Sequence, residues 1–279
     1  MVMPDSSMLG RMAIESSPPE LRVDFLDMMV RGDEQDTSRA AGMMAEAGVG
    51  CLVTLGGDGT NRAVARNVGS VPIVPISTGT NNVFPETLEG TVAGLAAGVV
   101  AAGLVDVRKV TKVARRLEVH INGDLVDIAL VDVAVSKEAF VGARAIWEMD
   151  TVDEIFLART EPASIGLSAI GARLGDLSTS DGGMHIRLGP GDTLVFAPIV
   201  PGAVTPVPVR EWRLLPLHEA VEIKLRPCTI ALDGERAFGP SLDETISVSI
   251  SPGGPLVVDV DTALREAASN GVFTDRQTR

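Results

Sequence analysis

The stretch Cys51-Leu52-Val53-Thr54-Leu55-Gly56-Gly57-Asp58-Gly59-Thr60 decides how the rest of this chain is interpreted. An apolar run ends at two glycines, and an acid, a third glycine and the start of a helical pattern follow. This order predicts a strand, a tight turn and a helix, with Asp58 at the carboxyl end of the strand, where open α/β sheets bind their ligands. Taken alone, Gly-Asp-Gly is also a common turn sequence with no further meaning.

The chemistry of this turn favours a phosphate site. Glycine lets a ligand approach the backbone closely. The first amides of the following helix have no partner within it and lie at its positive end, and such helix ends bind anions readily. Asp58 would repel a bare phosphate, so we expect it to hold Mg²⁺ or to accept a proton from a substrate hydroxyl.

A second polar turn follows the next apolar run. Residues 71–76 predict a buried strand, which leads into Ser77-Thr78-Gly79-Thr80-Asn81-Asn82. Turns at the ends of successive strands can face one cleft. A helix predicted over 87–103 completes this α/β unit, and a further short strand is predicted over 21–28.

The second part of the chain reads as strands and turns. Alternation around Asn122-Gly123 predicts a hairpin. Asp132 stands within the apolar strand 131–135, and a buried acid usually has a partner or a ligand. The later sequence Asp233-Gly234-Glu235 is typical of a hairpin turn.

Composition narrows the class of protein. Hydrophobic residues make up 45% of the 279 residues, enough for a large core, and the formal net charge is −13. This charge argues against nucleic acid or an anionic membrane as a partner. The two cysteines lie in apolar segments and predict buried thiols in a reducing compartment, and no secretory signal or membrane span is visible. We therefore expect a cytoplasmic protein.

Three motifs in this order resemble the NAD kinase/diacylglycerol kinase superfamily. They are Gly56-Gly57-Asp58-Gly59-Thr60, then Thr78-Gly79-Thr80-Asn81-Asn82, then Ala231-Leu232-Asp233-Gly234-Glu235. Within it the chain is most similar to the ATP-NAD kinase-like branch that includes the acetoin-catabolism protein X. The resemblance implies an α/β N-terminal domain and a β-sandwich-like C-terminal domain, with the active site between them.

The resemblance also implies roles for particular residues. Asp58 would activate the accepting hydroxyl or lie near Mg²⁺, with ATP as donor and NAD as a candidate acceptor. The residues implied at the nucleotide are Gly56, Gly57, Gly59, Thr60 and Asn61 in the first motif and Thr78, Gly79, Thr80, Asn81 and Asn82 in the second. Candidates on the substrate side are Asp132, Asp233, Gly234 and Glu235.

Several features depart from the pattern of NAD kinases. In those enzymes an Asn precedes the acid of the strand that holds the dinucleotide, whereas Val131 precedes Asp132 here. A counterpart of their Thr-Gly-Ser-Thr-Ala-Tyr stretch is not visible either. The opening strand and Asn-Pro-x-x-Gly loop of the family are also not visible, so we expect the first strand of the α/β sheet to be missing from this sequence.

We expect an α/β nucleotide-binding domain over residues 1–105, a β-rich domain over 106–260, and a C-terminal helix and tail over 261–279 that packs back on the first domain. Three functions stay open. The first is an ATP-dependent phosphotransferase acting on a hydroxyl of NAD or a related small molecule. The second is a non-catalytic nucleotide-binding accessory protein, which Val131 favours. The third is a lipid kinase of the diacylglycerol kinase type, which the acidic charge disfavours. A homo-oligomer is expected because a thin first sheet gains from further burial.

Overall fold

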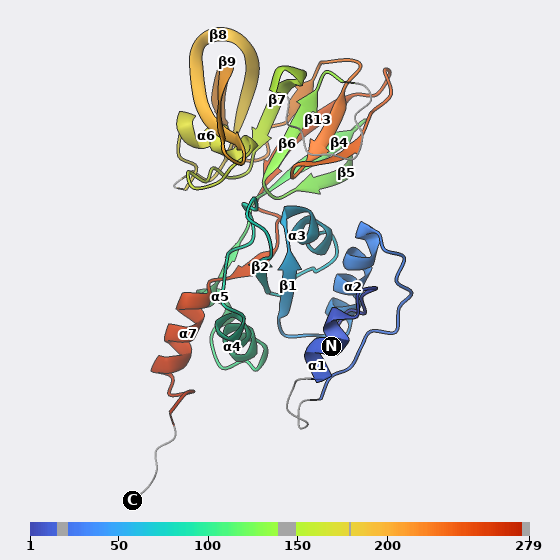
Figure 1. The fold of residues 1–279 in the computed structure, drawn as a ribbon, viewed down its shortest axis with the longest axis vertical. Coiled ribbons are helices and arrows are strands. Elements are labelled where there is room, and N and C mark those ends of the chain that lie inside the picture. The colour runs from blue at the N-terminus through green and yellow to red at the C-terminus, as the bar shows by residue number, and fades with distance from the viewer. Residues whose placement is uncertain (16–21, 139–148, 179, 275–279) are drawn as a thin grey trace, which may run out of the picture.

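The computed structural model describes residues 1–15, 22–138, 149–178 and 180–274. An α/β part lies against a part made almost wholly of β-strands (Figure 1). The predicted fold class, an α/β domain followed by a β-sandwich-like domain, is confirmed.

A four-stranded sheet in the order β1-β2-β14-β3 forms the base of the α/β part. Strands β1 (Leu52–Gly56) and β2 (Ile73–Ser77) run parallel. Strand β14 (Leu256–Val258) is parallel to β2 and antiparallel to β3 (Thr111–Val113). Two strands from the range 106–260 therefore complete the first sheet, and the divisions at residues 105 and 260 stay predictions.

The strand predicted over 21–28 is wrong within the described residues. Only Phe25 pairs there, in an isolated bridge with Val2. Strand β1 is thus at the edge of the four-stranded sheet, and its Val53 and Leu55 side chains are exposed. Whether a strand of the family is missing from the sequence stays a prediction.

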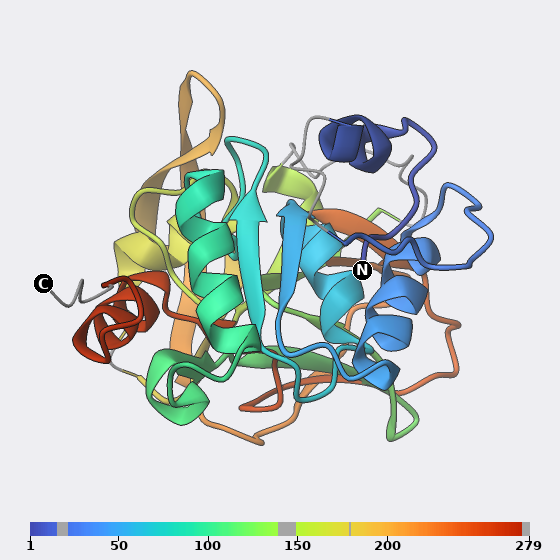
Figure 2. The same cartoon turned by 90° about the horizontal axis from the view of Figure 1, so that it is seen from below.

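Helices cover both faces of the four-stranded sheet (Figure 2). Helices α2 (Glu34–Glu46) and α3 (Asp58–Ala65) pack on one face and share a core with β1 and β2. Helices α4 (Gly90–Ala101) and α7 (Val260–Ser269) pack together on the other face, through small residues such as Ala96 and Ala263. The remaining helices of this part are α1 (Leu9–Glu15) and α5 (Val107–Val110).

Two antiparallel sheets form the β-sandwich. The six-stranded sheet has the order β12-β11-β6-β7-β8-β9, and the four-stranded sheet has the order β10-β13-β4-β5. Side chains from both, such as Leu117, Phe156 and Val248, fill the space between them. The strands are β4 (Arg116–Ile121), β5 (Asp124–Ala129), β6 (Asp132–Ser136), β7 (Val152–Leu157), β8 (Gly183–Val200), β9 (Ala203–Leu215), β10 (Val221–Ile223), β11 (Thr229–Leu232), β12 (Glu235–Phe238) and β13 (Ile246–Ser251).

Both hairpins predicted from short turn sequences are present. Asn122 and Gly123 join β4 to β5 with φ angles of 54° and 91°, and Asp233 and Gly234 join β11 to β12 with φ angles of 51° and 75°. Positive φ at both central residues is the geometry for which Asn-Gly and Asp-Gly are favoured.

Helix α6 (Leu167–Leu174) covers the outer face of the six-stranded sheet, where Ile170 packs with Leu157 and Met184. A 3₁₀ helix, η1 (Met149–Thr151), precedes β7. Within the described residues, every helix is too short or too polar to cross a membrane.

Candidate functional site

The three motifs meet at a cavity of about 300 Å³ between the α/β part and the sandwich. Motif residues and the acid of β6 form much of its wall. The lining residues are Gly57, Asp58, Gly59, Thr60, Asn81, Asn82, Val83, Asp132, Ile165, Gly166, Leu167, Ser168, Ile199, Asp233, Gly234 and Glu235. The cavity lies where β1 passes into α3, at the carboxyl end of a parallel strand, which is the usual ligand position in such sheets.

Asp58 is the first residue of α3, and its side chain holds the second motif in place. One carboxylate oxygen, Oδ1, accepts hydrogen bonds from the backbone amides of Val83 at 3.0 Å and Phe84 at 2.7 Å. Burial raises the pKa of Asp58, and the Phe84 and Val83 amides and the charge of Arg159 act against that rise. The motif aspartate is therefore an anchor for the loop after β2 as well as a wall of the cavity.

The glycines of the first motif are needed where the other two motifs approach it. A Cβ added to Gly57 would lie 2.7 Å from Oδ1 of Asn82, in the second motif. A Cβ added to Gly59 would lie 2.7 Å from Oε1 of Glu235, in the third. Real Cβ atoms do not tolerate contacts this short, so any larger residue would push one of these side chains away.

Several predicted residues lie outside the cavity wall. Asn61 is fully buried, accepts from the Thr54 hydroxyl at 2.6 Å and donates to the Gly57 carbonyl at 2.8 Å, so it braces the turn from behind. Gly56, Thr78, Gly79 and Thr80 also do not line the cavity, and the last three are exposed. Their roles at a nucleotide stay predictions.

Asp233 anchors the strand that carries Asp132. Its carboxylate accepts hydrogen bonds from the backbone amides of Leu130 at 3.0 Å, Val131 at 2.7 Å and Asp132 at 3.2 Å. Burial raises the pKa of Asp233 to about 7, although the Leu130 and Val131 amides favour its ionised form.

Asp132 differs from these two anchoring acids. Its Oδ1 atom is buried and has no hydrogen-bond partner within the described residues. Burial raises the pKa of Asp132 well above its usual value, and the charges of Asp233 and Asp58 add to that rise. The ionised form of this carboxyl group is therefore disfavoured relative to a free aspartate, and a buried polar atom without a partner in the described residues is a candidate contact for a ligand.

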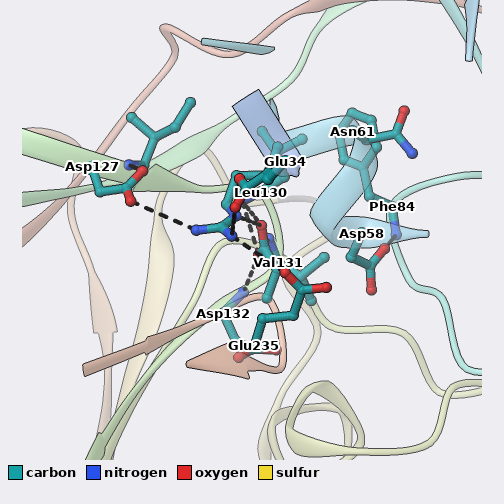
Figure 3. A network of polar contacts seen from close by, with 12 residues as sticks. Glu34, Asp58, Asn61, Phe84, Asp127, Leu130, Val131, Asp132 and Glu235 are labelled. Carbon is teal, nitrogen blue, oxygen red and sulfur yellow. Dashed lines mark hydrogen bonds and ion pairs between the residues drawn. The ribbon is translucent and has the colours of Figure 1, made fainter. Parts of the chain in front are cut away.

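Arg62, on α3, ties the α/β part to the sandwich. Its guanidinium is almost fully buried and lies within 3.2 Å of Glu34, 3.7 Å of Asp127, 3.9 Å of Asp233 and 3.5 Å of Glu235. These acids come from three different segments around the site, and Figure 3 shows Glu34, Asp127 and Glu235 gathered about this network. One cation thus offsets part of the negative charge of the cavity wall.

Sequence reasoning missed Arg62 and the segment 165–168. The sequence gives no local signal for Arg62, because its acidic partners lie far from it along the chain. The segment 165–168 lies where α6 begins, next to the cavity, with Gly166 in a positive-φ conformation of 96°. The glycine before an apolar helical run was the only local signal for this turn.

A dedicated metal site is not formed by the described residues, since no group of three or more His, Cys, Asp or Glu side chains is placed to hold an ion. Mg²⁺ that is bound together with ATP needs only one or two protein carboxylates, because the phosphates and water supply the other ligands. Asp58 could be such a carboxylate.

The fold and the site define an NAD kinase-like protein with a β-rich second part. The ATP-NAD kinase N-terminal domain model matches residues 4–104, and the acetoin catabolism protein X C-terminal domain model matches residues 115–253. The chain is 42% identical over 255 residues to acetoin catabolism protein X of Cupriavidus necator. The aligned region covers 88% of this chain and 70% of that relative. The chain belongs to the acetoin catabolism protein X family, and the predicted resemblance is confirmed.

Two solved structures are similar at lower levels. Yeast NADH kinase complexed with NADH is 16% identical, with a TM-score of 0.48, over 89% of this chain and 71% of that one. An NAD kinase from Archaeoglobus fulgidus in complex with ATP is 13% identical, with a TM-score of 0.45, over 98% of each chain.

Proposed function

We propose that the cavity binds a nucleotide and that the protein is an ATP-dependent phosphotransferase acting on a hydroxyl of NAD or a related small molecule. The observation that carries this proposal is the meeting of three distant motifs and Asp132 around one cavity at the end of β1. The match of residues 4–104 to the ATP-NAD kinase N-terminal domain supports it. A volume of about 300 Å³ is at the lower end for ligand pockets, which favours enclosure of only part of a dinucleotide.

In this proposal the first turn of α3 binds phosphate oxygens through its amides, because Gly57 and Gly59 leave the backbone open on the cavity side. Asp58 would be the protein ligand of the Mg²⁺ that accompanies ATP, and this ion would supply charge neutralisation for the phosphates. Phosphoryl transfer needs positioning and charge compensation above all, and both are functions that this turn can serve.

The proposed transfer forms a bond between the substrate hydroxyl oxygen and the γ-phosphorus of ATP, and the bond from that phosphorus to the β-phosphate oxygen breaks, so ADP leaves. The hydroxyl proton passes to a carboxylate. We assign this to Asp132 before Asp58, because Asp132 has an oxygen without a partner whereas Asp58 holds two backbone amides.

The test is to incubate the purified protein with ATP, Mg²⁺ and NAD and to measure NADP. Asp132→Asn should bind nucleotide as the wild type does but form NADP at least about 100-fold more slowly, the usual effect of losing a positioned base. No NADP above the level of an Asp58→Asn, Asp132→Asn double variant would eliminate NAD as the acceptor. A panel of other hydroxyl compounds would then decide whether the protein is a kinase at all.

A non-catalytic nucleotide-binding accessory protein is the second candidate. Val131 before Asp132 and the use of Asp58 as a backbone anchor favour it, since both reduce the polar groups left for substrate. Nucleotide binding by calorimetry, with no phosphate released or transferred for any acceptor, would support this candidate. A cytoplasmic location and a homo-oligomer stay predictions.

A further inference from the structure

A second cavity, of about 610 Å³, lies on the other side of the loop after β2. We call it the flank cavity. Phe84 lines the flank cavity, while its neighbour Val83 lines the candidate site, so one stretch of backbone separates the two spaces. Its walls come from α4, β3, β14 and α7 on the α/β side and from the segments around Arg115, Arg159 and Leu177 on the sandwich side.

Arg159 is the cation of the flank cavity that has no hydrogen-bond partner within the described residues. Its Nε atom is shut off from solvent and unbonded, and its guanidinium carbon lies 4.6 Å from the centre of the Phe84 ring. Burial lowers the pKa of Arg159, and the charge of Asp58 only partly offsets this. A ring contact stabilises a guanidinium but leaves its N–H donors unfilled.

The other two cations on the wall are already satisfied. Arg115 donates to the backbone carbonyls of Leu177, Ser180 and Gly182, which makes it part of the framework. Lys112 is paired with Asp259 at 2.9 Å and is mostly exposed. Within the described residues, Arg159 is therefore the cation of this wall whose guanidinium has no hydrogen-bond partner.

The rest of the wall determines what kind of anion would fit. Apolar side chains dominate it, including Val92, Val113, Val257 and Leu264. Val92 and Val113 are 39% and 54% exposed, which leaves apolar surface open at the cavity. Three acids, Glu86, Asp259 and Asp261, also stand on the wall, so a polyphosphate would meet repulsion that a single carboxylate would largely escape.

We propose that the flank cavity is a second ligand site, which takes an organic carboxylate with an apolar body. The carboxylate receives the N–H donors of Arg159, in the forked geometry that a guanidinium offers. The apolar body lies along Val92, Val113 and Leu264, where its burial removes hydrocarbon surface from water. This site is separate from the nucleotide cavity and does not depend on phosphotransfer by the protein.

The test uses straight-chain carboxylates as probes on the full chain, with affinities measured by calorimetry. Affinity should rise from acetate to butyrate to hexanoate, by up to about fourfold for each added methylene. Arg159→Gln should weaken hexanoate binding by about 10-fold or more, and Arg159→Lys, which keeps the charge but loses the fork, by less. Lys112→Gln is the matched control, because it removes a cation of the same cavity that already has a partner, and it should change binding by less than about twofold.

Circular dichroism of each variant checks that it is folded. If Arg159→Gln unfolds the protein, Arg159→Lys and Val92→Asp carry the test, and Val92→Asp should abolish the dependence on chain length. Hexanoate binding that is unchanged in Arg159→Lys and Val92→Asp would overturn the proposal. An absence of binding at about 10 mM hexanoate would also overturn the proposal, because a specific site would bind at lower concentrations. Tighter binding of inorganic phosphate than of hexanoate would also overturn it and would identify a phosphate site.

Discussion

Replacement of Asp58 separates its role as a backbone anchor from its role as a charge. In Asp58→Ala the amides of Val83 and Phe84 lose their acceptor, and one unsatisfied buried donor costs about 1–3 kcal/mol. Removing a buried carboxylate near Asp132 and Asp233 also relieves charge repulsion, and this offsets part of the loss of stability. We expect a net loss of about 2–4 kcal/mol in the free energy of unfolding.

Asp58→Asn should behave differently. Its side-chain oxygen can take the place of Oδ1, which accepts from both amides in the wild type, while the second contact of the Val83 amide, to Oδ2 at 3.1 Å, is lost. Because burial already raises the pKa of Asp58, loss of the charge relieves an unfavourable state. The expected change is within about 1 kcal/mol of the wild type.

Urea unfolding at neutral pH, followed by circular dichroism, measures both variants. Thr80→Ala is the control in the same loop, since Thr80 is exposed and its hydroxyl donates to the neighbouring Asn81 side chain. Its effect should lie within about 0.5 kcal/mol. The reasoning is refuted if Asp58→Ala is as stable as the wild type. Equal destabilisation by Asn and Ala would show that charge, and not hydrogen-bond acceptance, is what the site requires.

The other predictions concern the rest of the site. The pKa of Asp233 in the folded protein, about 7, is above that of an unfolded chain, so the folded form holds the proton more tightly and stability is lost as pH rises from about 4 to 7. Relative to Asp233→Asn, the wild type should lose up to about 1.4 kcal/mol in the free energy of unfolding for each pH unit in that window. The same dependence of this free energy on pH in the two proteins, measured by urea unfolding, would contradict this. Gly57→Ala should lower the free energy of unfolding by about 1–3 kcal/mol, because the Asn82 side chain that it would meet is held in place by a hydrogen bond. Gly59→Ala should cost less, because the Glu235 side chain that it would meet is exposed and can move. Thermal melts in which Gly59→Ala is the less stable of the two variants would count against this. Arg62→Met should destabilise by about 3–5 kcal/mol, since it removes the cation beside the buried Asp233 while Glu34 and Asp127 keep Arg66, and an unchanged urea midpoint would contradict this.

Much of the fold could be predicted because the deciding patterns are local. The apolar runs that end at Gly56 and Ser77 form β1 and β2, and Asn122-Gly123 forms its hairpin, since each depends on a few neighbouring residues. The strand expected at 21–28 failed because apolar residues alone do not supply a pairing partner, and Phe25 meets only Val2. Strands β3 and β14 joined the first sheet through pairings between segments far apart in the chain, which no local pattern contains.

The candidate site shows the same division. Three motifs and one buried acid could be picked out because glycine-rich polar turns after apolar runs, and an acid within an apolar strand, are local signals. Arg62 and Arg159 could not, because an arginine is usually exposed and only its neighbours in space distinguish it.

By itself the sequence determined that a strand ends at Gly56 in a glycine-rich turn, and which family carries that turn with two others. Only the tertiary structure decided what the acids do. Asp58 accepts a hydrogen bond from a backbone amide 25 residues away, and Asp233 accepts one from an amide about 100 residues away. Sequence patterns cannot place these backbone segments beside the two acids. Within the described residues Asp132 is left with an unpartnered oxygen and Arg159 with an unpartnered Nε, because hydrogen bonds depend on distance in space and not on separation along the chain.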